Sequence, residues 1–66
     1  MRQGGKMKRG TVVRLLDGTR GVVLMQYKDI TRVFCEDLNV YPVNTDTLVD
    51  TGKYFDLSII WDTIKE

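Results

Sequence analysis

The 66-residue sequence contains no histidine and only one cysteine, Cys35. Without histidine there is no Ser-His or Cys-His catalytic pair and no imidazole that titrates near neutral pH. A single cysteine excludes an intrachain disulfide, and one thiol among scattered carboxylates is a poor zinc site. We therefore expect a protein that is not an enzyme and that carries no metal and no cofactor.

Long hydrophobic stretches are also missing. The longest fully apolar run, residues 22–25, is far shorter than the roughly 20 residues that span a bilayer. The basic N-terminus leads into an alternating pattern rather than into the apolar region of a signal peptide. An unpaired cysteine is most easily kept reduced inside the cell. These features predict a cytoplasmic protein that makes no use of a membrane.

The remaining candidates for chemistry are weak. Cys35 lies directly before Glu36, and a neighbouring carboxylate raises a thiol pKa, which is the wrong direction for a nucleophile. We interpret Cys35 as a small core residue. The glycines do not form a phosphate-binding loop, because no Gly-Lys-Ser/Thr follows them.

The composition is that of one small globular domain, with 42% hydrophobic and 29% charged residues. A chain of this length buries only about 60% of its unfolded surface, and the sequence offers no disulfide or metal to compensate. Its stability must come from an efficient core, a partner or a second copy. We expect a flexible basic arm over residues 1–9 and a single β domain over residues 10–66. Met7 is an alternative native start.

Alternating and β-branched residues predict short strands separated by turn signals. Asp17-Gly18 predicts a two-residue hairpin turn, and Gly21 is suited to a bulge or bend. Residues 44–53, rich in Asn, Asp, Thr and Gly, are expected to be a loop. Residues 54–64 fit a strand better than a helix, although the apolar residues Leu57, Ile60, Trp61 and Ile64 also have helical spacing. The predicted strands cover residues 11–16, 19–27, 30–36, 40–43 and 54–64.

This pattern predicts an all-β fold, either a small five-stranded barrel or a strongly bent antiparallel sheet. A short C-terminal helix in place of the last strand is the alternative. The six aromatic side chains are expected to supply most of the core.

Residues 8–23, KRGTVVRLLDGTRGVV, resemble the opening hairpin of SH3-like barrels, and the KOW and Tudor-like branches are the nearest in appearance. The whole chain also resembles short uncharacterised proteins of bacteriophages and prophages, which end in a segment similar to YFDLSIIW, residues 54–61. The first resemblance implies an SH3-like fold, and KOW modules commonly bind RNA or proteins. The second implies a phage or prophage origin and no site residues.

Charge is unevenly distributed. Residues 1–20 contain six basic residues and one acidic residue, whereas residues 21–66 contain four basic and eight acidic residues. Basic side chains near one hairpin can follow a phosphate backbone. The tentative nucleic-acid-binding residues are Lys8, Arg9, Arg14 and Arg20.

The aromatic C-terminal segment suggests a different contact, because Tyr and Trp are enriched at protein interfaces. The tentative interface residues are Tyr54, Ile60 and Trp61. An unpaired edge of the closing strand could accept a partner strand, which makes a homodimer possible. Because the acidic second half would repel a polyanion, we expect a binding module for an unknown protein partner such as a host factor, with nucleic-acid binding as the alternative.

Overall fold

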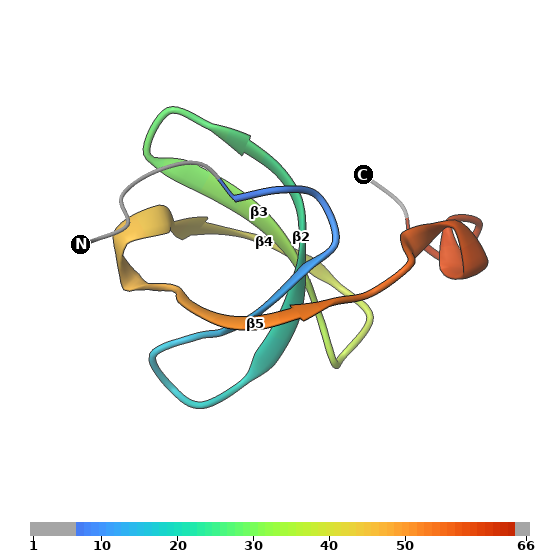
Figure 1. The fold of residues 1–66 in the computed structure, drawn as a ribbon, viewed down its shortest axis with the longest axis horizontal. Coiled ribbons are helices and arrows are strands. Elements are labelled where there is room, and N and C mark those ends of the chain that lie inside the picture. The colour runs from blue at the N-terminus through green and yellow to red at the C-terminus, as the bar shows by residue number, and fades with distance from the viewer. Residues whose placement is uncertain (1–6, 65–66) are drawn as a thin grey trace.

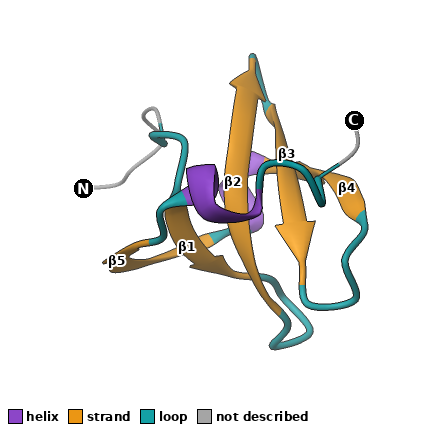
Figure 2. Cartoon of the chain, turned by 90° about the vertical axis from the view of Figure 1, so that its right-hand side faces the viewer, coloured by secondary structure: helices purple, strands orange, loops and turns teal. Residues whose placement is uncertain are grey.

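Five antiparallel strands form a single bent sheet in the order β4-β3-β2-β1-β5 (Figure 1). The structure is a computed structural model that describes residues 7–64. The strands are β1 (Thr11–Arg14), β2 (Arg20–Tyr27), β3 (Ile30–Cys35), β4 (Val40–Asn44) and β5 (Val49–Tyr54). Two 3₁₀ turns, η1 (Thr45–Thr47) and η2 (Leu57–Ile60), precede and follow β5. The all-β prediction is confirmed, but the sheet is not closed into a barrel, and β4 and β5 form its two edges (Figure 2).

The central strands carry apolar side chains on both faces of the sheet. The face that we call inner holds the buried residues Val13, Val23, Val33 and Cys35, against which Leu48 packs. The opposite, outer face holds Leu24 and Phe34, which are buried together with Leu57. Val13 and Val23 are fully buried, whereas Arg14, on the opposite face of β1, is exposed.

A bulge in β2 decides which side chains reach the outer face. Val23 pairs with Val33 and Met25 pairs with Arg32, so Leu24 is an extra residue in β2. An extra residue shifts the alternation of every side chain that follows it. Met25 and Tyr27 therefore lie on the outer face, and both are exposed.

The predicted fifth strand over residues 54–64 is wrong. The carboxylate of Asp56 accepts hydrogen bonds from the backbone N–H of Ser58 (3.0 Å) and from its hydroxyl (2.6 Å), which starts η2 instead. Leu57, Ile60 and Ile64 then pack on the outer face with the spacing of a helical turn. We call residues 55–64 the C-terminal segment; it crosses in front of β2 in Figure 2.

The actual fifth strand lies in the stretch that was expected to be a loop. Strand β5 pairs with β1, and the register shifts between Val12 and Val13. The extra residues fit because Gly52 takes a positive φ of 80° and the Thr51 hydroxyl donates to the carbonyl oxygen of Val12 (2.6 Å). The polar residues 49–54 thus form a strand because the backbone N–H and C=O groups at the edge of β1 need hydrogen-bond partners.

The turn between β1 and β2 is also longer than predicted. The N–H of Gly18 donates to the carbonyl of Leu15 (3.0 Å), and the N–H of Leu15 donates to the carbonyl of Thr19 (2.8 Å). Gly18 has a φ of 91°, whereas Asp17 does not have a positive φ. This is a three-residue loop that ends in a left-handed glycine, rather than a two-residue type I′ turn.

Residues 1–6 of the expected arm lie outside the described residues. Met7 is half-buried against the inner core, and its backbone N–H donates to the side-chain oxygen of Gln26 (2.8 Å). The N–H of Gly10 donates to the carbonyl of Val23 (2.8 Å). Residues 7–10 therefore run along the edge of β2 beyond the end of β1.

Gly21 is required by a close approach of strands rather than by the bulge. A Cβ atom at this position would lie 2.3 Å from Cγ1 of Val33 and 3.1 Å from the carbonyl oxygen of Phe34. Both neighbours are buried in the centre of the sheet, so neither can move away freely.

Gly21→Ala should therefore destabilise the protein by about 1–3 kcal/mol, the usual cost of overpacking. In a Val33→Ala background, where the clashing methyl is gone, the added penalty of Gly21→Ala should be smaller. Urea unfolding of the four proteins in the cycle measures this coupling. Equal penalties in both backgrounds would show that the contact between Gly21 and Val33 is not the constraint.

Candidate functional site

The residues predicted for nucleic-acid binding do not all lie together in the structure, and neither do those predicted for a protein interface. Arg20 and Ile60 line one hollow on the outer face, and Arg9 and Trp61 line another. The C-terminal segment lies between these two hollows, and Phe55 contributes to both. Residues from the predicted nucleic-acid set and the predicted protein set thus meet in pairs.

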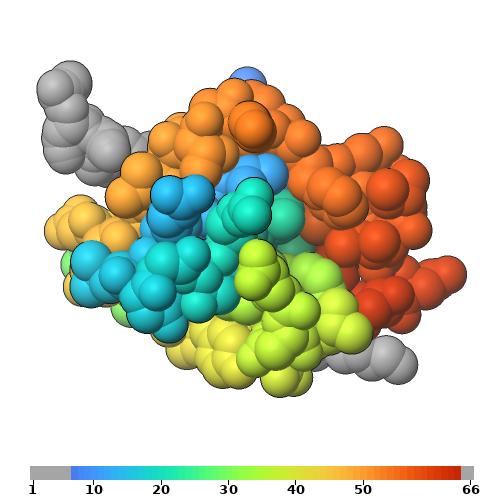
Figure 3. All heavy atoms as spheres, turned by 90° about the horizontal axis from the view of Figure 1, so that it is seen from below, coloured from blue at the N-terminus to red at the C-terminus, as the bar shows by residue number. Residues whose placement is uncertain are grey.

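The first hollow, which we call the groove, has a volume of about 290 Å³ and an almost entirely apolar lining. It lies where the start of β2, the turn after β3 and the C-terminal segment meet, on the face drawn in Figure 3. The apolar side chains of the groove are Val12, Val22, Phe34, Leu38, Phe55 and Ile60. Arg20 and Glu36 lie at its rim, 3.9 Å apart, with both side chains mostly exposed.

Three cations lie on the same face as the groove, and one of them, Arg20, lines it. Arg14 and Arg20 occupy directly opposite positions on β1 and β2, and Lys53 is opposite Val12 on β5. Side chains at opposite positions share a face, and like charges placed in this way repel each other. Glu36 compensates Arg20 only weakly, because an exposed ion pair at this distance has little energy.

Leu38 is the most unusual residue of the groove. It lies in the turn between β3 and β4 with a φ of 69°, and its side chain is 64% exposed. A left-handed backbone is costly for leucine and is better tolerated by Asn or Gly. The fold gains little buried surface from this side chain in return. Leu38 thus combines a strained backbone with an exposed apolar side chain.

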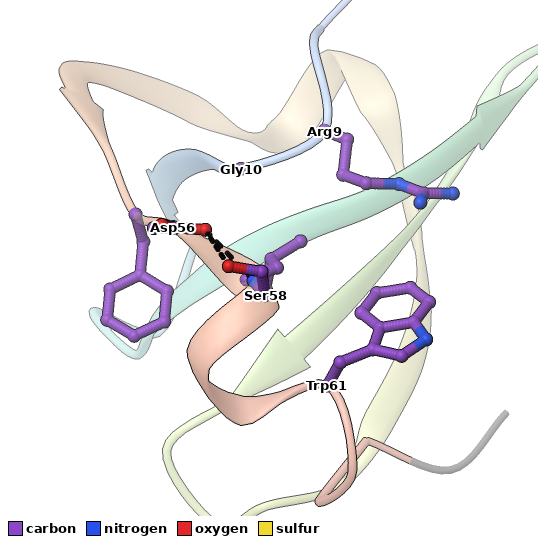
Figure 4. A pocket seen from close by; sticks show the side chains of 7 residues that line it. Arg9, Gly10, Asp56, Ser58 and Trp61 are labelled. Carbon is purple, nitrogen blue, oxygen red and sulfur yellow. Dashed lines mark hydrogen bonds between the residues drawn. The ribbon is translucent and has the colours of Figure 1, made fainter.

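The second hollow, the Arg9–Trp61 cleft, holds a cation against an aromatic ring (Figure 4). The Arg9 guanidinium carbon lies 5.1 Å from the centre of the Trp61 ring, within the range of a cation–π contact. Its Nε–H donates to the carbonyl oxygen of Leu24 (2.9 Å), which fixes the orientation of the guanidinium. Asp56 and Ser58 form the wall on the other side.

The other predicted residues lie apart from both hollows. Lys8 is exposed in the segment before β1, and Tyr54 is exposed at the end of β5. The expectation that the aromatic residues mostly fill the core is wrong, since among them only Phe34 is buried. The small sheet is filled by aliphatic side chains, which leaves exposed the aromatic residues Tyr27, Tyr41, Tyr54 and Trp61.

Cys35 is a buried core residue, as expected. Burial is the main reason that its thiol pKa is raised, and the negative charges of Asp37, Asp17 and Glu36 raise it further. The thiol therefore stays protonated at neutral pH and is a poor nucleophile. Within residues 7–64, no three His, Cys, Asp or Glu side chains gather as a metal site, and no helix is long and apolar enough to cross a membrane.

Two residues in or near the groove were missed at the level of sequence. Lys53 was placed in a loop, and it lies opposite Val12, a residue of the groove, only because β5 pairs with β1. Leu38 follows two acidic residues and precedes Asn39, so it looked like part of an ordinary turn. The one available signal was the residue type, because a large apolar residue occupies a turn position that favours Asn or Gly.

Comparison of the chain with models of protein families, with curated proteins and with solved structures finds no match.

The position of Trp61 changes the expected effect of its removal. The side chain is 43% exposed, so Trp61→Ala should cost only about 1–2 kcal/mol, from the cation–π contact and the buried part of the ring. Leu57→Ala, by contrast, removes a buried side chain and should cost about 2–5 kcal/mol. Urea unfolding compares the two variants. A larger loss for Trp61→Ala than for Leu57→Ala would contradict this arrangement.

Proposed function

We propose that this protein is a non-enzymatic binding module that holds a short segment of a protein partner in the groove. The observation that carries the proposal is Leu38, which projects an exposed apolar side chain into the groove from a strained backbone. Apolar anchors that fill a pocket dominate the energy of protein interfaces. A kinship with SH3-like barrels, which rests on the opening hairpin, and an origin in a phage or prophage, which rests on the pattern of the whole chain and its closing segment 54–61, belong to the same proposal.

The charges near the groove indicate the kind of partner segment that it would bind. Arg14, Arg20 and Lys53 lie on this face, against one acidic side chain at the rim, Glu36. Complementary charges favour a partner segment that carries Asp or Glu. The apolar lining requires at least one large apolar side chain in the middle of that segment. We therefore propose a partner segment with an apolar anchor flanked by acidic residues.

A library of random peptides selected on the immobilised full chain tests this proposal. The enriched peptides should combine a large apolar residue with neighbouring acidic residues. Binding of a synthetic peptide from this set should weaken on the order of tenfold or more in Leu38→Asn, because an anchor contact is lost. The folded protein should be as stable as the wild type or slightly more stable, because Asn tolerates a positive φ.

Leu16→Asn is the matched control. Leu16 is 82% exposed in the turn between β1 and β2 and is not among the residues that line the groove. This variant should bind the selected peptide with wild-type affinity, whereas Arg20→Glu should weaken binding and remove its preference for acidic peptides. Selection of peptides without acidic residues, or equal losses in Leu38→Asn and Leu16→Asn, would reject the groove as the binding site.

A further inference from the structure

Two exposed aromatic rings on the outer face each carry a cation. Arg9 lies over Trp61, and the Lys28 ammonium lies 5.5 Å from the centre of the Tyr27 ring. Tyr27 is 69% exposed, so its ring is available to a ligand. These contacts are separate from the groove, since none of these four residues lines it.

The bulge at Leu24 brings the two pairs onto one surface. Arg9 is bound to the carbonyl of Leu24, and Tyr27 follows three residues later on the outer face, a distance of roughly 10 Å along the strand. The two cations, Arg9 and Lys28, line one cleft together with Met7, Met25 and Gln26. Figure 2 shows that the β2–β3 hairpin extends beyond the C-terminal segment, so this segment does not cover the tip of the hairpin.

The surface between the rings is cationic. Arg32 is exposed and lies directly opposite Met25 on the outer face, so a third positive charge stands beside Arg9 and Lys28. The acidic residues close to these pairs are Asp56, which lines the Arg9–Trp61 cleft, and Asp29 and Asp62, which directly follow Lys28 and Trp61 in the chain. We call Arg9, Tyr27, Lys28, Arg32 and Trp61 the hairpin surface.

Alternating rings and cations match the chemistry of a single nucleic-acid strand. Its bases stack on aromatic rings and on guanidinium planes, and its phosphates attract Lys and Arg. A protein segment would use the apolar side chains Met25 and Ile30, but it would gain less from cations placed beside each ring. The combination of stacking platforms with positive charge favours the nucleic acid.

We propose that the hairpin surface binds single-stranded nucleic acid, with Trp61 and Tyr27 stacking against bases and Arg9, Lys28 and Arg32 contacting phosphates. This site differs from the basic hairpin around Arg14 and Arg20 that the sequence suggested. It is also independent of the groove, so the protein can hold a strand and a protein segment at the same time.

The fluorescence of Trp61 provides a direct measurement, because it is the only tryptophan in the chain. The full chain is titrated with 12-nucleotide oligo(dT) and oligo(U) at several salt concentrations. Stacking of a base should quench the fluorescence in a saturable manner. Three phosphate contacts should give a slope of roughly −2 in a plot of log affinity against log salt, at about −0.7 for each contact.

Variants test the site itself. Tyr27→Ala should weaken binding on the order of tenfold, and its matched control is Tyr54→Ala, which removes a tyrosine of similar exposure (65%) that lies away from this surface. Arg32→Ala should reduce the salt slope by about 0.7, whereas Arg14→Ala should not change it. Leu38→Asn, which removes the anchor contact of the groove, should leave the titration unchanged.

The proposal is overturned if neither oligonucleotide quenches the fluorescence, or if the affinity does not depend on salt. It is also overturned if Tyr27→Ala and Tyr54→Ala weaken binding equally, since the contact would then not involve this face. Peptide binding in the groove is measured separately with Leu38→Asn, so either site can fail without the other.

Discussion

The central strands of this sheet are apolar on both faces, and a single bent sheet can bury only one of them. Val23 and Val33 lie in the inner core, whereas Leu24 and Phe34 point the other way. Burying both sets is worthwhile in so small a domain, because each apolar side chain removed from water stabilises it by about 1.5–3 kcal/mol. The outer set requires a cover, and the C-terminal segment provides it by placing Leu57 over Leu24 and Phe34.

The C-terminal segment is shorter than the outer face on which it packs. Both proposed sites lie on the parts of this face that the segment does not cover. On one side the groove remains open between the start of β2, the turn after β3 and Ile60. On the other side the β2–β3 hairpin extends past the cover, and the bulge at Leu24 turns Tyr27 outward. Within the C-terminal segment, Phe55 and Ile60 line the groove, and Trp61 meets Arg9.

The parts of the fold that local signals determine could be predicted from the sequence. Alternating residues and the turn glycine identified β1, β2 and β3 to within two residues at each end. Strand β5 could not be predicted, because its polar residues become a strand only through the free edge of β1. The C-terminal segment was ambiguous because Leu57 fits both a strand and a helical turn, and the choice depends on its contact with Leu24.

Several residues of the candidate sites could be selected from the sequence by their type, but their arrangement in space could not be predicted. Arg9, Arg20, Ile60 and Trp61 were all selected by type, yet their partners were misassigned because they depend on where the C-terminal segment packs. Leu38 and Tyr27 escaped notice for another reason. Their importance depends on side-chain exposure and on backbone geometry, and the periodicity of the sequence predicts neither.

The docking of the C-terminal segment on the outer face can be measured directly by nuclear Overhauser contacts in solution. The account predicts contacts between the methyl groups of Leu57 and both the Phe34 ring and the Leu24 methyl groups, which are buried together. Absence of these contacts, with random-coil chemical shifts for residues 57–64, would contradict it, because neither the groove nor the Arg9–Trp61 cleft would then exist.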